Sequence, residues 1–415
     1  MHLNNDILNI ILNYLSIEII YSCKLLNKQC DYFIENEFVL IYYRGNYVNK
    51  KIINKHCANI KKLVSTGKKY GFDPLTASAI NSWIPINEAI NDNDLQLLSK
   101  LKILKLPMNN EITDEGLKYI PNIKKLCLVN NNNITNEGLK YISKIKKLDL
   151  FHNKNITDEG LKYIPNIKYL ELYHSNDISN EGLKYIPKIK ILKLQLTNKI
   201  TDNGLKYIAE KNNGMTNIKI LYLPLNENIT DEGLKYISNV KELYFCINKN
   251  ITDNGLKYIP NIEILRMDKN TNITDEGLKY IHNIKKIRLE SNNITDKGLQ
   301  YICNVQELYL DFNKKITNKG LKYIPNVEKL DLQQNRIITN KGLKYIPNIK
   351  VLKMEHNKNI NVTDFKYNSN IQKLHLRYND NINDEIFEYI PNIELVELYT
   401  NGKLYKCYKR KLKNK

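Results

Sequence analysis

Two histidines and two carboxylates occupy matching points of the sequence and are the groups best suited to hold a metal ion. The interval from Asp149 to Glu171 is the same as that from His152 to His174. Imidazole nitrogens and carboxylate oxygens are common ligands of divalent metals, so four such groups brought together could bind a cation. They could equally be polar contacts for another protein. No further ligand or nucleophile accompanies them, so we expect interface residues, with no metal and no other cofactor.

Motifs for catalysis are missing from the rest of the sequence. It contains no Ser, His and Asp in the order of a hydrolase triad, no glycine-rich phosphate loop and no Cys–His pair. The seven cysteines are scattered and form no Cys-x-x-Cys pair, which argues against a disulfide framework and a zinc site. We therefore expect a protein that is not an enzyme and that works in a reducing compartment.

The interval between these matching residues belongs to a repeat that fills most of the chain. Residues 112–126 read ITDEGLKYIPNIKKL, and near copies follow with a 22-residue period, broken once by a longer interval and once by a shorter one. The longer interval contains a seven-residue insertion within 209–216. A period this short and regular is typical of a solenoid, in which each unit buries its apolar face only against its neighbours.

Each unit combines a short strand with a short helical segment. Leu148 and Leu150 alternate with other residues, so they should lie on one face of a strand, and successive strands should form a parallel sheet. Thr113 should cap a helical turn that Pro121 ends. Asn153 follows the strand, where its amide could satisfy backbone groups and stack with its equivalents as a ladder. These equivalents are Asn131, Asn226, Asn248, Asn270, Asn292, Asn313, Asn335, Asn357, Asn379 and Asn401.

The unit pattern Ile-x-x-Leu-x-Leu-x-x-Asn-x-x-Ile-Thr resembles the leucine-rich repeat, and the N-terminus resembles the F-box. Residues 1–45 lack the repeat and show helical periodicity instead. Asn4 replaces the Pro usual in an F-box, and Cys30 stands where Trp is expected. The residues placed as in the F-box pattern, which would form its docking face, are Leu3, Ile7, Leu8, Ile11 and Leu15.

An F-box-like segment followed by Ile-Thr-Asp-Glu-Gly-Leu repeats resembles the F-box/leucine-rich-repeat proteins, which are substrate receptors of cullin-type ubiquitin ligases. The resemblance implies that the N-terminal helices dock on a Skp-type adaptor of a cullin complex while the repeats capture a target protein. A plain interaction scaffold with a helical N-terminal cap is the first alternative. The second is a binder of nucleic acid or acidic surfaces that uses lysines on the outer face.

The expected architecture is an α/β solenoid, a leucine-rich-repeat horseshoe of about 14 units with a 22-residue period and an N-terminal helical F-box-like domain. The expected parts are 1–45 (F-box-like), 46–93 (a connector or cap, with a degenerate repeat at 59–64), 94–401 (repeats) and 402–415 (C-terminal cap and basic tail). The residue usage is typical of AT-rich genomes such as those of large DNA viruses or protists. No signal peptide or long apolar run is visible, so we expect a protein of the cytoplasm or nucleus without membrane contact. If the source is viral, these are compartments of the host cell. We also expect a monomer.

The strand positions on either side of the second Leu differ in every unit, whereas the rest of the unit barely changes. They should lie on the concave face, where they total six basic and eight acidic residues. The formal charge of +19 must then sit on the outer face, which makes nucleic acid an unfavourable partner for the concave face. The predicted partner-binding residues are Asp149, Phe151, His152, Glu171, Tyr173, His174, Tyr222, Tyr244, Arg266, Arg288 and Tyr309.

Overall fold

The computed structural model describes most of the repeat region of the 415-residue chain. The described residues are 40–44, 62–66 and 90–409, apart from 107–108, 174–176, 196–198, 290–292, 336, 356–359, 378–382, 384 and 401–402. The predicted docking residues Leu3, Ile7, Leu8, Ile11 and Leu15 lie outside this range. The chain divides into two compact units, Met1–Lys199 and Ile200–Lys415, which are taken separately below as unit 1 and unit 2.

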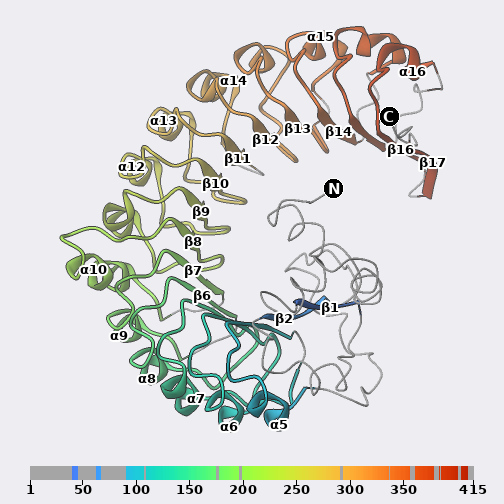
Figure 1. Cartoon of the computed structure of the whole chain (residues 1–415). Coiled ribbons are helices and arrows are strands. Elements are labelled where there is room, and N and C mark those ends of the chain that lie inside the picture. The colour runs from blue at the N-terminus through green and yellow to red at the C-terminus, as the bar shows by residue number, and fades with distance from the viewer. Residues whose placement is uncertain are drawn as a thin grey trace, which may run out of the picture. The chain divides into compact units, whose positions relative to one another are not determined.

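Unit 1 is built from parallel strands on one side and short helices on the other (Figure 1). Each strand pairs with the next in the same register, so that Leu126 lies opposite Leu148 and Leu148 opposite Leu170. The strands are β1 (Leu40–Arg44), β2 (Lys62–Thr66), β3 (Ile103–Lys105), β4 (Lys125–Cys127), β5 (Lys147–Asp149), β6 (Tyr169–Tyr173) and β7 (Ile191–Gln195). The helices are α5 (Asp92–Gln96), α6 (Asp114–Leu117), α7 (Asn136–Tyr141), α8 (Asp158–Leu161) and α9 (Asn180–Leu183).

The first two strands extend the sheet beyond the regular repeats. β2 forms where residues 59–64 resemble the strand half of a repeat, and it pairs in parallel with both β1 and β3. β1 lies at the end of the 1–45 segment, which the sequence predicts to be helical. Its run Leu-Ile-Tyr-Tyr-Arg has no helical period and is rich in residues that favour strands.

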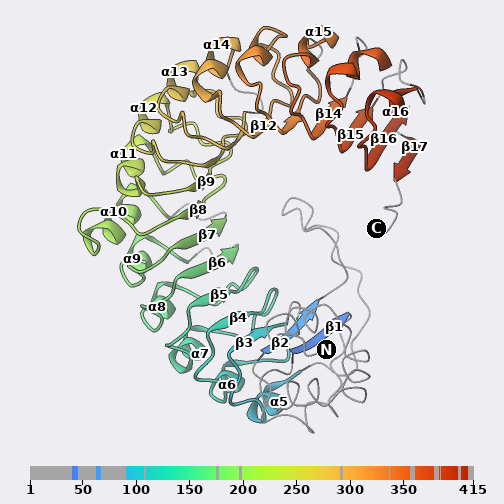
Figure 2. The same ribbon diagram turned by 45° about the horizontal axis from the view of Figure 1, so that its top comes forward.

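Unit 2 repeats the same arrangement (Figure 2). Its strands are β8 (Ile220–Tyr222), β9 (Glu242–Tyr244), β10 (Ile264–Arg266), β11 (Lys286–Arg288), β12 (Glu307–Tyr309), β13 (Lys329–Asp331), β14 (Val351–Glu355), β15 (Lys373–Arg377), β16 (Leu395–Thr400) and β17 (Lys403–Lys409). Its α-helices are α10 (Asp202–Glu210), α11 (Asp231–Leu234), α12 (Asp253–Leu256), α13 (Asp275–Leu278), α14 (Asp296–Leu299), α15 (Asn340–Leu343) and α16 (Ile386–Tyr389), and its 3₁₀ turns are η3 (Lys235–Ile237), η4 (Gln300–Ile302), η5 (Gly320–Tyr323) and η6 (Val362–Tyr367).

Two irregular features of unit 2 follow from the sequence. The seven-residue insertion begins within α10, which is the longest helix among the described residues. At the C-terminal end, β17 turns back and pairs antiparallel with β16, so the predicted C-terminal cap contains a strand.

The core lies between the strands and the helices of each unit. Leu117, Ile120, Ile123, Leu126 and Leu128 of one repeat are fully buried, and the corresponding positions of the other repeats are buried in the same way. Each repeat therefore buries its apolar residues against its neighbours, as the predicted α/β solenoid requires.

A ladder of asparagines satisfies the backbone where the chain leaves each strand. The Nδ2 of Asn153 donates to the carbonyl oxygens of Asn131 (2.7 Å) and Ile134 (2.8 Å) in the preceding repeat. Its Oδ1 accepts from the backbone N–H groups of Asn155 (2.8 Å) and Ile156 (3.2 Å). The predicted ladder is thus confirmed at the described positions Asn131, Asn153, Asn226, Asn248, Asn270, Asn313 and Asn335. It also includes Asn109, which sequence reasoning missed.

The residue before a ladder asparagine adopts a left-handed backbone conformation that the sequence did not indicate. His152 has φ 66°, and Ile247, a β-branched residue for which this region is strained, has φ 61°. Asn130, Leu225, Lys269, Phe312 and Gln334 share the conformation. Each such residue costs about 1–2 kcal/mol, which the hydrogen bonds of the following asparagine offset.

A second ladder explains the glycine that recurs in the repeats. The Asp114 carboxylate accepts from the backbone N–H of Thr135 (2.8 Å) and from its hydroxyl (2.6 Å) in the next repeat. A Cβ on Gly138 would lie 2.2 Å from Asp114 Oδ1, which is closer than two such atoms can approach. The glycine is therefore needed to make room for the aspartate of the preceding repeat.

We predict that Gly138→Ala lowers the free energy of unfolding by about 1–3 kcal/mol, because the new methyl group displaces Asp114 from Thr135 and breaks two hydrogen bonds. In an Asp114→Ala background the same change should be neutral or stabilise by up to about 1 kcal/mol, since Ala favours a helix over Gly. Urea unfolding of the four proteins, followed by circular dichroism, measures both effects. An equal loss in the two backgrounds would contradict this account of the glycine.

Candidate functional site

Three side chains per repeat, rather than two, point away from the helices. The hydroxyl of Tyr309 donates to Glu307 (3.2 Å) and that of Tyr244 donates to Glu242 (3.3 Å), which places the first residue of each strand on the same face as the third. We call this surface the inner face of each unit. Sequence reasoning missed the first row, although the two-residue period of a strand extends one step back to it. The row contributes five lysines and two glutamates, which leaves the face close to neutral: Lys125, Lys147, Lys286, Lys329, Lys373, Glu242 and Glu307.

The inner face of unit 1 brings together the predicted carboxylates Asp149 and Glu171, which lie opposite each other on β5 and β6. Asp149 accepts a hydrogen bond from the Cys127 thiol (Sγ–Oδ2 3.3 Å). Glu171 accepts from the Tyr169 hydroxyl and forms an ion pair with Lys193 (Nζ–Oε2 3.3 Å). Both carboxylates are therefore engaged by neighbouring side chains of the same unit.

Burial sets the protonation of this cluster. It raises the pKa of Asp149, and repulsion from Glu171 raises it further. Burial, followed by the charge of Asp149, raises the pKa of the Cys127 thiol far above its usual value. Burial, followed by its hydrogen bond to Glu171, does the same for the pKa of Tyr169. Because the thiolate is the reactive form of cysteine, Cys127 is not activated as a nucleophile.

Of the two histidines, His152 is described, and it does not complete a metal site with these carboxylates among the described residues. His152 packs its ring edge-on against Phe151, with the ring centroids 4.4 Å apart. His174 lies outside the described residues, and Tyr173 is described only by its place in β6. In the described part of the chain, no group of three or more His, Cys, Asp or Glu residues could hold a metal ion.

The inner face of unit 2 carries five predicted binding residues side by side. They are the last residues of β8 to β12, and each lies opposite the next in the register of the sheet. We call them the Tyr–Arg row: Tyr222, Tyr244, Arg266, Arg288 and Tyr309. The rings of Tyr222 and Tyr244 contact each other with centroids 5.5 Å apart, and the guanidinium of Arg288 lies 5.9 Å from the Tyr309 centroid.

Two buried aspartates hold the arginines of this row. Arg288 bridges them, with Nη2 2.7 Å from Asp311 Oδ2 and Nε 3.0 Å from Asp268 Oδ1. Arg266 donates to the second oxygen of Asp268. The aspartates are only 5% and 4% exposed, and Asp311 Oδ1 has no hydrogen-bond donor within the described residues. Buried ion pairs of this kind contribute little net stability, which favours a role in recognition.

A third buried aspartate lies on β13, the strand next to the last strand of the Tyr–Arg row. Asp331 lies opposite Tyr309, is 7% exposed, and has Lys353 Nζ 3.7 Å from its Oδ2. Burial raises its pKa to about 6, although the hydrogen bond from Gln333 and the charge of Lys353 act in the opposite direction. The sequence placed all three aspartates on the concave face, but it could not show that they are buried.

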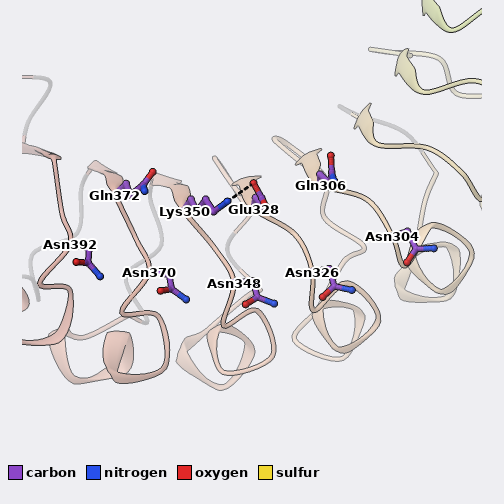
Figure 3. Close-up of a pocket in the computed structure, with 9 residues that line it drawn as sticks. All are labelled: Asn304, Gln306, Asn326, Glu328, Asn348, Lys350, Asn370, Gln372 and Asn392. Carbon is purple, nitrogen blue, oxygen red and sulfur yellow. Dashed lines mark ion pairs between the residues drawn. The ribbon is translucent and has the colours of Figure 1, made fainter.

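A polar groove of about 650 Å³ runs along the residues that precede the strands of unit 2 (Figure 3). Asn348, Asn370 and Asn392 each donate to a carbonyl oxygen of the preceding repeat at 3.3 Å, so their amides serve the backbone. The other residues that line the groove are Asn304, Gln306, Asn326, Glu328, Lys350 and Gln372. Lys350 and Glu328 form an ion pair (2.9 Å). The groove holds no catalytic arrangement.

The outer face contrasts with the inner one because it repeats one motif. Lys118 pairs with Glu115 in the same helical turn (2.5 Å) and lies 5.2 Å from the ring centroid of Tyr141 in the next repeat. The same lysine–glutamate pair recurs as Lys140–Glu137, Lys162–Glu159, Lys184–Glu181, Lys235–Glu232 and Lys279–Glu276. Exposed pairs of this kind contribute little stability and no variety for recognition.

Comparison with known proteins agrees with this architecture. The family model described as Leucine Rich repeat matches residues 98–120, 121–143, 143–164, 187–209, 214–238, 258–282, 280–303, 302–324, 323–346 and 367–390, which together cover more than half of the chain. The chain belongs to the leucine-rich repeat family. No curated protein matches the sequence of this leucine-rich repeat protein.

Two solved structures share the fold. An internalin, InlF of Listeria monocytogenes, is 19% identical with a TM-score of 0.51, over 76% of this chain and 89% of its own. A chain of the Rad7–Elc1 complex of yeast is 15% identical with a TM-score of 0.50, over 76% of this chain and 84% of its own. Likenesses at this level of identity concern the fold alone. Among the described helices, none has the length and apolar character needed to cross a membrane.

We predict that Asp331→Asn stabilises the protein at pH 7 by an amount on the order of 1–3 kcal/mol. The native pKa of Asp331 is raised from 3.8 to about 6. The free energy of unfolding of the wild type therefore falls as the pH rises from about 4 to 6, and it remains at this lower value at higher pH. Below about pH 4 the carboxyl is neutral in both states, so the difference should vanish. Urea unfolding between pH 4 and 7 tests this, and a gain of equal size at both ends would contradict it.

Proposed function

We propose that the inner face of unit 2 is the main protein-binding surface of this leucine-rich repeat scaffold, with the Tyr–Arg row at its centre. The observation that carries the proposal is the register of β8 to β12, which presents Tyr222, Tyr244, Arg266, Arg288 and Tyr309 in one line. Tyrosine and arginine are enriched among the residues that dominate binding energy at protein interfaces. Stacked repeats supply the extended surface on which such residues act together.

The buried aspartates support this proposal by fixing the row before a partner arrives. Asp268 contacts Arg266 and Arg288, and Asp311 contacts Arg288 from the other side. An arginine held in place loses less conformational freedom on binding, so more of its contact energy appears as affinity. A guanidinium presented in this way suits carboxylate or carbonyl oxygens on the partner.

We further propose that the protein is a substrate receptor of a cullin ubiquitin ligase, acting in the cytoplasm or nucleus. The support is the F-box-like pattern of residues 1–45, which would bind a Skp-type adaptor while unit 2 holds the target. The yeast chain of similar fold belongs to a complex with Elc1, so a repeat array of this kind is compatible with a second subunit.

For the target, we predict that Tyr244→Ala/Tyr309→Ala removes most bound protein. Each truncation at an interface centre typically costs about 2 kcal/mol or more, so the pair should weaken binding by at least about 100-fold. The proteins captured by the wild-type chain are compared by quantitative mass spectrometry with those captured by this variant. The matched control is Tyr280→Ala/Tyr323→Ala on the outer face, where both tyrosines are exposed. Equal loss with the control variant would argue against the Tyr–Arg row.

For the adaptor, we predict that wild type co-purifies with a Skp-type adaptor and that Leu8→Asp/Ile11→Asp does not, because charges would replace apolar docking residues. The Tyr244→Ala/Tyr309→Ala variant should keep the adaptor while losing the target, since it leaves the sequence of residues 1–45 unchanged. If wild type and the Leu8→Asp/Ile11→Asp variant bind the adaptor equally poorly, the substrate-receptor proposal fails and the scaffold function remains.

A further inference from the structure

Five lysines stand immediately before successive strands of unit 1. They precede β3, β4, β5, β6 and β7, and they recur once in each repeat. We call them the lysine ladder: Lys102, Lys124, Lys146, Lys168 and Lys190. All five are exposed or half-buried, so their ammonium groups are accessible to a ligand.

The backbone fixes the spacing of the ladder. The N–H of Lys124 donates to the carbonyl oxygen of Lys102 (2.8 Å), that of Lys146 to Lys124 (2.9 Å) and that of Lys168 to Lys146 (2.9 Å). The N–H of Lys190 donates to Lys168 in the same way (2.9 Å). Successive lysines are therefore one strand apart, about 4.8 Å, and the ladder spans about 20 Å.

The positive charge of the ladder is not neutralised within the described part of unit 1. None of the five lysines forms an ion pair with an acidic residue of that part. Within the described part of the chain, Lys146 Nζ donates to a backbone carbonyl oxygen, that of Asn166 (3.3 Å). Partial burial, followed by repulsion from Lys168, Lys124 and Lys188, lowers the pKa of Lys146. The cluster thus has excess positive charge that an anion would relieve.

A groove of about 550 Å³ lies beside the middle of the ladder. Lys124 and Lys146 line it from the ladder, and Lys144 and Lys162 line it from the neighbouring turns. Ser143, Tyr163, Pro165 and Asn166 complete the lining. Two of the five ladder lysines, Lys124 and Lys146, therefore line a concave feature together with two further lysines.

The same edge of unit 2 provides an internal comparison (Figure 3). The residues before its strands are Lys219, Lys241, Glu263, Lys285, Gln306, Glu328, Lys350, Gln372 and Glu394. Here Glu263 pairs with Lys241 (3.0 Å) and Lys285 (2.7 Å), and Glu328 pairs with Lys350 (2.9 Å). A general preference for lysine would act on both units alike, so the unbroken ladder of unit 1 requires a local reason.

We propose that the lysine ladder and its groove bind an acidic segment of a protein partner, a run of aspartates and glutamates in extended form. Lysine is a point charge without a fixed fork, which suits carboxylates on a flexible chain. Single-stranded nucleic acid is held by several aromatic side chains on which bases stack, and the groove offers one tyrosine, Tyr163. Each ladder lysine directly precedes a strand of unit 1, so one protein could cover both the lysine ladder and the inner face of unit 1.

The proposal is tested with the full chain and a fluorescently labelled peptide of eight glutamates, by anisotropy. Wild type should bind, and Lys124→Gln/Lys146→Gln/Lys168→Gln should weaken binding by about tenfold, since it removes three exposed ion pairs with the peptide, each of which contributes modestly. The matched control is Lys241→Gln/Lys285→Gln/Lys350→Gln in unit 2, which removes the same charge and should weaken binding by less than about threefold. Binding should also fall as salt is raised.

Two results would overturn the proposal. Equal weakening by the two triple variants would show that net charge, not the ladder, attracts the peptide. Tighter binding of a single-stranded octanucleotide than of the peptide, lost in the Lys124→Gln/Lys146→Gln/Lys168→Gln variant, would make nucleic acid the ligand. Circular dichroism and the urea midpoint of both variants establish that they are folded. Absence of any wild-type binding at low salt would also refute the proposal.

Discussion

The asparagine ladder is the contact on which the rest of the structure depends. A 22-residue unit must turn sharply after each strand, and the turn is buried between neighbouring repeats. Asn153 satisfies two carbonyl groups of the preceding repeat and two N–H groups of its own, so one side chain closes the turn and joins two repeats. It also accompanies the left-handed conformation of His152. Without such a partner, the buried backbone groups would make the fold unfavourable.

The aspartate–threonine ladder complements it on the helical side. Asp114 reaches from one repeat to Thr135 of the next, through the space that Gly138 leaves open. Both ladders act between nearest neighbours, so the stability of the array is built from identical contacts along its length. Because these contacts involve only inward and outer positions, the strand residues of the inner face are free to vary without loss of the fold.

This separation allows each surface a different chemistry. The outer face repeats an exposed lysine–glutamate pair, which gives this surface charges of both signs. The inner face of unit 2 instead buries Asp268 and Asp311 beneath two arginines, an arrangement that is unfavourable for stability unless a partner uses it. The edge of unit 1 accumulates lysines that repel one another. Departures from the stable repeat therefore mark the surfaces available for recognition.

Periodicity alone determined the solenoid, the parallel strands, the asparagine ladder and two of the three rows of strand residues that face away from the helices, since these follow from a 22-residue repeat and the two-residue alternation of a strand. Three features depended on the tertiary structure. Gly138 is required by Asp114, which belongs to the preceding repeat in the chain but is adjacent in space. The burial of Asp331 depends on side chains of neighbouring strands. The ladder lysines look the same as other lysines in the sequence, because charge compensation is set by distances between repeats, which a one-dimensional pattern does not contain.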